Sequence, residues 1–282
     1  PEDKVTDDLR ISEKSAEKWN KLGFTTAGVS SHDGIFAGNV AAVTLKAGSA
    51  SEVTLNADLG QKLDFRKGSS KTPYPSSLMG SIALIRQTLM DADWYGKAMS
   101  RSGVPGTDEP EFNISLEALN AAVKANKPFF VRAYDEHDIK RWERIAEENK
   151  INLIIRGSGM EVRRHEDIAP YKADFILPVD FPKVPDVSNP VDARNVSLTD
   201  LINWYWAPSN AAYLDAAGSR VAFTLDGLKN KKDLFSKLRE IKDRDFDQDK
   251  ILAALTTVPA AYLGVEKKVG KIASNMLANL VV

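Results

Sequence analysis

The chain has 282 residues, and its 38 Lys and Arg nearly balance its 39 Asp and Glu, for a formal net charge of −1. This balance argues against nucleic acid or an anionic membrane as a partner, because both attract basic proteins. The chain has no cysteine, which excludes disulfides, thiolate nucleophiles and sulfur ligands to a metal. No apolar run approaches the ~20 residues of a membrane-spanning helix, so no membrane span is expected.

The first third of the chain mixes helical patterns with β-rich runs. Residues 12–22 fit a short amphipathic helix, and residues 23–29 follow as a buried strand. Two further β-rich runs, 40–45 and 52–59, are expected to form a hairpin that is inserted in, or leads into, a larger sheet. After a polar loop, a long helix begins at Ser76, with apolar side chains recurring on one face.

A regular alternation of helix and strand occupies the middle of the chain. Buried-strand patterns at 128–132, 151–155 and 173–177 each follow a helical pattern. Helices that connect successive strands are typical of parallel sheets. In a closed barrel of parallel strands, side chains at the carboxyl ends of the strands point into a common mouth, where such folds carry out their chemistry.

The last third begins with the proline-rich segment 178–195, which is too long for an ordinary connection and is expected to be a lid over the mouth. Helices are expected at 198–206 and 208–217, followed by a strand at 220–224. The remaining patterns predict helices at 230–241, 247–256 and 257–263, and an apolar strand at 278–282.

Asp226 is the first candidate for a catalytic group. It follows the strand 220–224 and precedes Gly227, where the strand ends and its loop begins. In a barrel its carboxylate would point into the mouth. The alternative is that Asp226 only caps the turn after the strand.

Three sets of residues carry a resemblance to a known family. They are 22–28 (LGFTTAG), 224–227 (TLDG) and, most specifically, the run after Ala253, which begins AALTTVPA and ends LANLVV. With these motifs the chain resembles the amidohydrolase superfamily, in particular its imidazolonepropionase-like branch. The helix that follows Tyr74 looks like a subgroup of that branch found in large, often exported bacterial proteins.

The resemblance implies a distorted TIM-like (β/α)8 barrel of the metal-dependent hydrolase type, with a small β-sandwich built from residues before and after it. We expect residues 1–272 to form the barrel without its first strand. Residues 273–282 are then expected to return as a strand to a truncated β-sandwich. The resemblance also implies an exported or periplasmic location, and partners among other domains of the same longer protein.

Members of this family hydrolyse amide or related C–N bonds in small substrates such as cyclic imides and dipeptides, with one or two divalent metals such as zinc. The resemblance places Asp226 at the position of the acid that binds metal and takes a proton from the attacking water. The His-x-His pair of the family's first strand has no counterpart. Arg132 stands where the family has a histidine on its fifth strand, and Arg156 lies near the expected ligand of the sixth.

These arginines decide the prediction about metal. A guanidinium has no lone pair to donate and stays protonated, so Arg132 cannot replace an imidazole as a ligand. We therefore expect the metal to be absent or weakly bound, and Arg132 to pair with Asp226 in its place. The alternative is that Arg132 turns to solvent or pairs with Asp135 or Glu136. Arg132 and Arg156 are in addition candidates for binding the substrate.

Histidine and tryptophan supply the remaining candidates. His137 and His165 fall on charged helical faces. His32 follows the first buried strand, so it is a candidate for contact with the substrate, or it only closes a polar turn. Trp204 and Trp206 could stack on a substrate ring or peptide, although at helical spacing packing is the alternative.

Two functions follow from these observations. The first is a hydrolase domain that acts on amide or cyclic amide C–N bonds, in which Asp226 moves the proton. The second is a catalytically silent domain of the same fold, which acts as a scaffold or interaction partner for an active domain. Because fold does not determine function, the missing ligands favour a chain that does not turn over substrate by itself.

Overall fold

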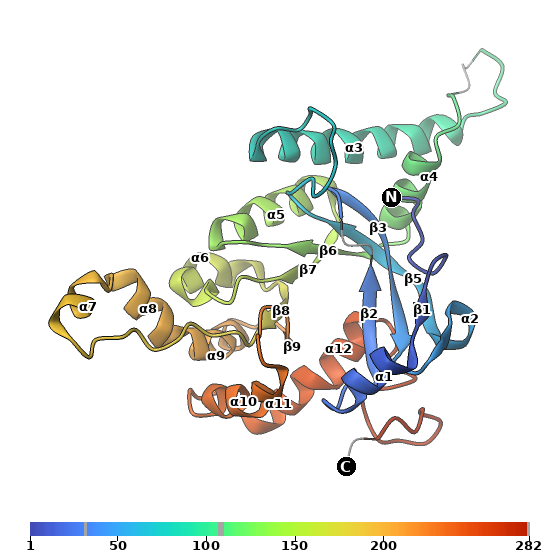
Figure 1. The fold of residues 1–282 in the computed structure, drawn as a ribbon. Helices are drawn as coiled ribbons and strands as arrows, with labels where there is room; N and C mark the ends of the chain where they lie inside the picture. Colours follow the sequence, from blue (N-terminus) through green and yellow to red (C-terminus); the bar gives the residue numbers. More distant parts are fainter. Residues whose placement is uncertain (31–32, 107–109, 281–282) are drawn as a thin grey trace.

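The computed structural model describes residues 1–30, 33–106 and 110–280. Its centre is a seven-stranded sheet, with strands in the order β2-β3-β5-β6-β7-β8-β9, that curls into an open half-barrel (Figure 1). The strands are β2 (Thr26–Ser30), β3 (Phe36–Thr44), β5 (Thr54–Leu63), β6 (Pro128–Arg132), β7 (Asn152–Arg156), β8 (Asp174–Pro178) and β9 (Val221–Thr224).

The strand directions confirm the two parts that the sequence predicts. β5 to β9 pair in parallel, as expected from the alternation of helix and strand. β2 and β3 pair antiparallel, and β3 pairs antiparallel with β5, so an antiparallel ribbon leads into the parallel sheet. β2 is an edge strand and is only half-buried, whereas the sequence predicted it as fully buried.

The start of β5 differs from the prediction of a strand over 52–59. Ser49 and Glu52 form a capping box, which begins the short helix α2 (Ala50–Val53). The strand therefore starts only at Thr54. A second sheet pairs β1 (Arg10–Ile11) with β4 (Gly48–Ser49).

Each face of the parallel sheet buries its own core, because successive side chains of a strand point to opposite faces. Phe129 and Val131 of β6 pack with the helices on the outer face. Phe130 packs on the inner face with Ile154 of β7 and Ala222 of β9. Arg132 and Arg156 have the same parity as Phe130 and Ile154, so they belong to the inner face.

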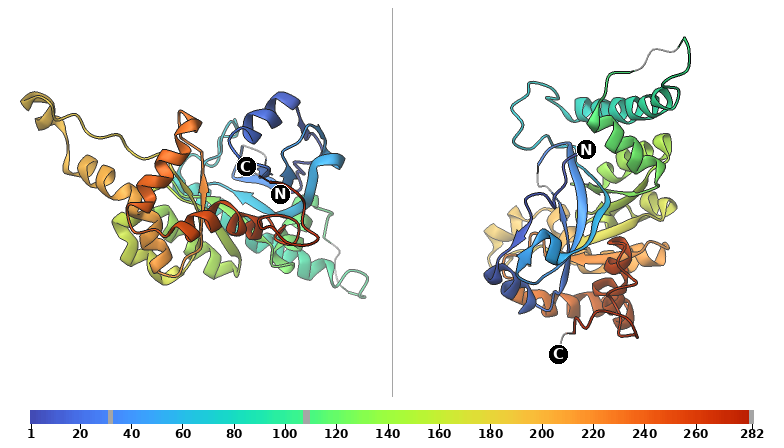
Figure 2. Two further views of the ribbon diagram at one scale, coloured as in Figure 1. Left: turned by 90° about the horizontal axis from the view of Figure 1, so that it is seen from below. Right: turned by 90° about the vertical axis from the view of Figure 1, so that its right-hand side faces the viewer.

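Helices cover the outer face of the sheet and close its lower end (Figures 1 and 2). Apart from the short helix at 190–195, which lies in the segment predicted as a lid, these helices agree with the predicted ones to within a few residues. They are α1 (Glu13–Asn20), α3 (Leu78–Met99), α4 (Ile114–Lys124), α5 (Glu136–Asn149), α6 (His165–Ile168), α7 (Pro190–Asn195), α8 (Leu198–Trp206), α9 (Asn210–Ala216), α10 (Leu234–Lys242), α11 (Gln248–Leu255) and α12 (Thr257–Tyr262), with 3₁₀ turns at Glu161–Arg164, Ala169–Tyr171, Ala207–Ser209 and Lys231–Asp233. None of the described helices is both long and apolar enough to cross a membrane.

The segment predicted as a lid takes a different course. Residues 180–206, which include α7 and α8, form an arm that projects from the body of the molecule (Figure 1, and Figure 2, left). Its apolar side chains Val187, Val191 and Leu198 are exposed, whereas Phe181 near its start packs against the core.

The C-terminal residues also differ from the prediction. Among the described residues 273–280 there is no strand. Residues 281 and 282 lie outside the described part of the chain. The strand that would return to a β-sandwich therefore stays a prediction.

Candidate functional site

Strand register brings the candidate residues together at the carboxyl ends of the parallel strands. Arg132 and Arg156 are register partners on β6 and β7. Asp226 comes two residues after the end of β9. Its Oδ2 accepts a hydrogen bond from Nη2 of Arg156 at 2.8 Å and lies 3.6 Å from Nη2 of Arg132. The expected proximity of Arg132 and Asp226 is confirmed, and Arg156 is the closer partner.

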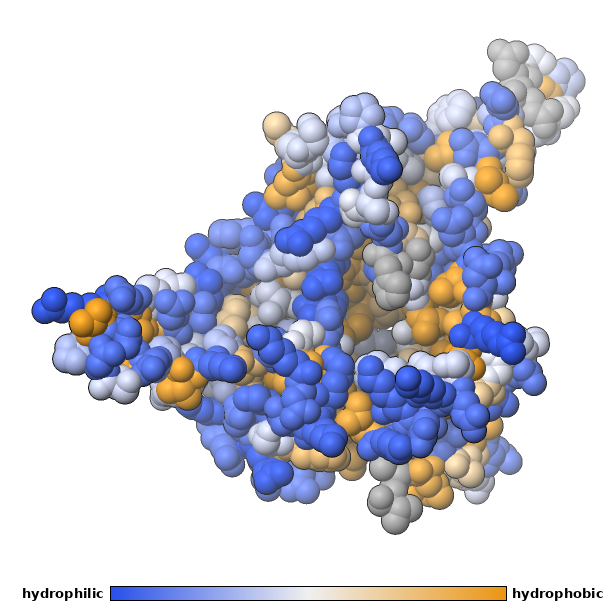
Figure 3. All heavy atoms as spheres, in the orientation of Figure 1, coloured by the Kyte–Doolittle hydropathy of each residue, from blue (hydrophilic) through white to orange (hydrophobic). Residues whose placement is uncertain are grey.

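This cluster lies open to solvent. The side chains of Asp226 and Arg132 are 52% and 43% exposed, and that of Arg156 is 21% exposed. Asp226 is exposed because the sheet is a half-barrel and its inner side is hollowed (Figure 3). Screening by water therefore weakens the attraction between the carboxylate and Arg132.

Arg156 is the most constrained member of the cluster. Burial lowers the pKa of its guanidinium, while the nearby carboxylate of Asp226 opposes that effect. Its Nη1 donates a hydrogen bond to the carbonyl oxygen of Gly157. The Nε atoms of Arg132 and Arg156 are buried and have no hydrogen-bond partner. The outer nitrogens are therefore the ones that can contact a ligand.

A buried carboxylate fixes the loop after β7, and the sequence analysis did not find it. Glu161 is fully buried, and its Oε1 accepts hydrogen bonds from the backbone N–H of Ser158 at 2.5 Å and its hydroxyl at 2.9 Å. Oε2 accepts a hydrogen bond from Nδ2 of Asn210 at 2.6 Å. A Cβ on Gly157 would come within 2.6 Å of Oε1, so glycine is required there. The spacing Ser-x-x-Glu could have indicated this contact.

A second group of polar side chains lies beside Arg132. The Tyr134 hydroxyl donates a hydrogen bond to Oδ2 of Asp64 at 2.8 Å. Burial and this bond raise the pKa of Tyr134 to about 12, so its hydroxyl stays protonated. The guanidinium carbons of Arg66 and Arg132 lie 3.4 Å and 4.9 Å from the centre of the Tyr134 ring. Asp64 comes just after β5, and Tyr134 comes just after β6. This shared position after strand ends is the sequence pattern that could have predicted their contact.

The described residues do not fit the metal that the resemblance implies. Within the ranges that the structure describes, no three His, Cys, Asp or Glu side chains gather as a metal site would require. Oδ2 of Asp226 faces two guanidiniums, which repel a cation and cannot ligate it. His165 does not contribute to this cluster: its Nδ1 bonds to the carbonyl oxygen of Val162 and its ring contacts that of Tyr213. His32 lies outside the described residues.

The predicted tryptophans gather with other aromatic rings. The Trp206 ring lies 5.1 Å from that of Tyr205 and 5.7 Å from that of Tyr213, and the Trp204 ring lies 6.5 Å from that of Tyr205. The guanidinium of Arg244 lies 4.4 Å from the centre of the Tyr205 ring. Both tryptophans are half-buried at the base of the arm. These contacts are those expected from packing, and the substrate contact stays a prediction.

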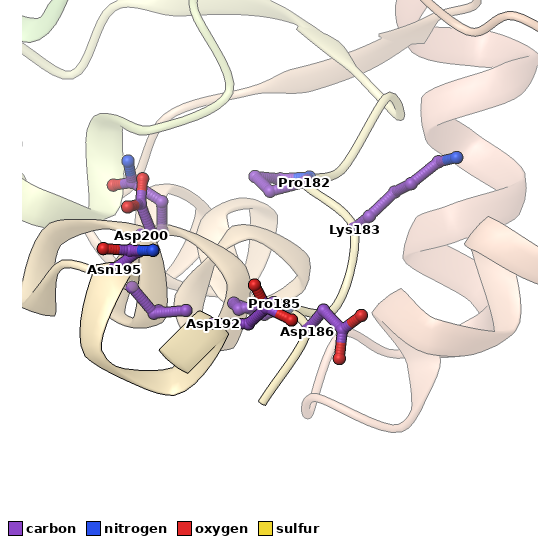
Figure 4. A pocket seen from close by; sticks show the side chains of 9 residues that line it. Pro182, Lys183, Pro185, Asp186, Asp192, Asn195 and Asp200 are labelled. Atoms are coloured by element: carbon purple, nitrogen blue, oxygen red, sulfur yellow. The ribbon is translucent and has the colours of Figure 1, made fainter. Parts of the chain in front are cut away.

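A shallow pocket lies within the arm and contains none of the predicted site residues. Lys183 points away from the other labelled side chains (Figure 4). Its lining is Pro182, Lys183, Pro185, Asp186, Asp192, Asn195, Val196, Asp200 and Asn203.

One solved structure shares the fold of the chain, and others match it more weakly. An amidohydrolase from Thermotoga maritima MSB8 superposes with a TM-score of 0.78 over 99% of this chain and 71% of its own, at 19% sequence identity. A Xaa-Pro dipeptidase with bound methionine matches at a TM-score of 0.41 and 16% identity, over 61% of this chain and 43% of its own. A prolidase complexed with N-methylphosphonate-L-proline matches at a TM-score of 0.39 and 14% identity, over 76% of this chain and 57% of its own. No protein-family profile and no curated protein matches the sequence.

The first of these similarities confirms the expected fold class, a distorted TIM-like α/β barrel. At this identity the similarity concerns the fold alone. The assignment to the imidazolonepropionase-like branch stays a prediction.

Proposed function

We propose that this chain is a catalytically silent domain of the amidohydrolase fold, which acts as a binding or scaffold domain for other parts of its protein. The observation that carries the proposal is the contact of Asp226 with two guanidiniums. Arg156 donates a hydrogen bond to this carboxylate at 2.8 Å, and Arg132 lies 3.6 Å from it. Both arginines bind the carboxylate of Asp226, which would otherwise bind metal and accept the proton of water.

The domain boundaries belong to this proposal. Residues 1–272 form the barrel part, and residues 273–282 lead back towards a β-sandwich. The apolar composition of the last five residues supports this division. Zinc, if it binds at all, would take Asp226 as its ligand only after both arginines had moved away.

Metal analysis tests the proposed function directly. The purified chain is dialysed, then incubated with excess Zn²⁺ or Mn²⁺, dialysed again and analysed by mass spectrometry. We expect well under one metal ion per chain, because two permanent cations share the only candidate ligand of the cluster. Asp226→Ala is then expected to leave the metal content unchanged. Near-stoichiometric metal that is lost in Asp226→Ala would overturn the proposal.

A second candidate function is hydrolysis of C–N bonds in small amides or dipeptides. Two observations favour it: Asp226 lies just after the last strand of the sheet, and the chain shares its fold with an amidohydrolase. Catalysis would then require Asp226 to act as a general base towards water. Hydrolysis of dipeptides or cyclic imides by the purified chain, abolished in Asp226→Asn, would favour this candidate over the silent domain.

A further inference from the structure

The inner face of the half-barrel carries a row of cations at its upper edge. Lys62 of β5 is the register partner of Phe130, and Arg132 and Arg156 follow on the next two strands. All three side chains share the inner face, because register partners point to the same side of a sheet. Burial lowers the pKa of Lys62; the negative charge of Asp64 opposes this effect, and the positive charge of Arg132 adds to it. Arg132 is therefore close enough to repel both Lys62 and Arg156.

The acids nearby do not use up the donors of Arg132 and Arg156. Asp226 is the carboxylate that touches Arg132 and Arg156, and these three side chains together carry a net charge of +1. The negative charge of Glu161 also favours the charged form of Arg156. Asp64 accepts its hydrogen bond from Tyr134. Glu161 is saturated by backbone and amide donors.

Of the two arginines, Arg132 is the one whose guanidinium has donors left for a ligand. Among the described residues, no hydrogen bond from its guanidinium is found, although its side chain is 43% exposed. The Tyr134 ring holds the guanidinium in place from one side, at 4.9 Å. A planar guanidinium that is ordered by a ring and open to solvent is suited to bind a carboxylate or phosphate through two parallel hydrogen bonds.

We propose that Arg132 and Arg156 form a binding site for the oxyanion group, carboxylate or phosphate, of a small ligand. Asp226 is the internal anion that the ligand displaces from the two guanidiniums. This inference rests on the proposed function, because it assigns to the silent domain the class of ligand that it binds. The same arginines that exclude a metal cation thus attract an anion.

Binding is measured with acetate, inorganic phosphate and neutral acetamide, from the dependence of the melting temperature on ligand concentration at constant ionic strength. Acetate or phosphate is expected to raise the melting temperature, and acetamide is not. The tighter of the two anions identifies the ligand as a carboxylate or a phosphate. No stabilisation by either anion beyond that by acetamide would overturn the inference.

Variants locate the site. Arg132→Gln and Arg156→Gln are each expected to weaken anion binding roughly tenfold, since each removes charge-assisted hydrogen bonds. Arg194→Gln, an exposed arginine of α7 on the arm, is the matched control and should bind as the parent does. Arg132→Lys keeps the charge but not the planar fork, so intermediate affinity is expected. Equal binding by the parent and Arg132→Gln would contradict the assignment.

Asp226→Asn distinguishes this inference from the proposed function. Loss of the competing carboxylate is expected to tighten anion binding several-fold, whereas a metal hydrolase would lose its metal through the same change. Unchanged or weaker anion binding in Asp226→Asn, with no metal in the parent, would refute the oxyanion site and leave the silent domain standing. Stoichiometric metal in the parent would refute the silent domain itself.

Discussion

At the scale of single residues, the chemistry of arginine decides what this site can bind. Arg132 stands at a position where the resemblance implies histidine, and its guanidinium lies within 3.6 Å of Asp226. The interaction is solvent-exposed on both sides, so it contributes little to the free energy of unfolding. Its effect is on specificity, because a fixed positive charge excludes cations and attracts anions.

Glu143 of α5 gives a prediction about pH. Burial raises its pKa from 4.5 to about 7, so the folded protein binds this proton more tightly than the unfolded chain does. The stabilising contribution is complete below about pH 4.5 and is lost as the pH rises to about 7. Glu143→Gln is therefore expected to raise the free energy of unfolding at pH 8 by about 1 to 2 kcal/mol, measured by urea denaturation.

The control is Glu147→Gln, which changes an exposed carboxylate of the same helix. Its stability should follow that of the parent at every pH. If the difference between Glu143→Gln and the parent were the same at pH 4 and pH 8, the assignment of a raised pKa to Glu143 would be wrong.

At the scale of elements, α5 determines where Arg132 lies. Asp135 caps the helix by accepting a hydrogen bond from the backbone N–H of Asp138, so the helix begins directly after the strand end. Trp142 lies on the same helix, and its Nε1 donates a hydrogen bond to the carbonyl oxygen of Arg132 at 2.8 Å. Its ring is fully buried and stacks on Phe65 at 3.9 Å. The helix thus holds the backbone of β6 at the point where the site begins.

Substitution of Trp142 should separate the contribution of its hydrogen bond to Arg132 from that of its buried ring. Trp142→Phe keeps most of the ring but leaves the carbonyl of Arg132 without its donor, and we expect a loss of about 1 to 2 kcal/mol in the free energy of unfolding. Trp142→Ala adds a cavity, and a loss of about 3 to 5 kcal/mol is expected. Urea denaturation measures both.

Trp94→Phe on α3 is the matched control, because the Trp94 side chain is exposed. Its effect should stay within about 0.5 kcal/mol of zero. Equal effects of Trp94→Phe and Trp142→Phe would show that the bond to Arg132 contributes nothing measurable.

At the scale of the whole molecule, a helix from the end of the chain fills the inside of the half-barrel. Tyr262 of α12 is buried against Ile154 of β7 and Ala222 of β9. Its hydroxyl donates a hydrogen bond to the carbonyl oxygen of Arg220 at 2.7 Å, and burial raises its pKa. α12 therefore occupies the lower interior, and the arginines lie at the upper edge, where their side chains are partly exposed.

Tyr262 therefore tests how far the half-barrel depends on its C-terminal helix. Tyr262→Phe is expected to lower the free energy of unfolding by about 1 kcal/mol through loss of one buried hydrogen bond. Tyr262→Ala is expected to lower it by about 3 to 5 kcal/mol, because it opens a cavity between helix and sheet. Tyr171→Phe, at an exposed tyrosine, should leave stability unchanged. A melting curve of Tyr262→Ala that matches the parent would contradict this role of α12.

The sequence by itself determined the order of the elements and the chemistry of the site. The periods of helices and strands are local, so the alternation that predicts a parallel sheet can be read without the fold. The place of Asp226 after a strand, and the inability of arginine to bind metal, are also properties of the residues alone. Together with the family resemblance, which placed Arg132 at a ligand position of the barrel, they predicted that Arg132 and Asp226 would meet.

The tertiary structure decided everything that depends on distances between elements. Register placed Arg156 nearer to Asp226 than Arg132 is, and no local pattern predicts register between distant strands. The burial of Glu161 required Asn210, which comes from a different helix. The course of the arm, and the exposure of Asp226 in a half-barrel, followed from how much apolar surface each segment could bury against the rest of the chain.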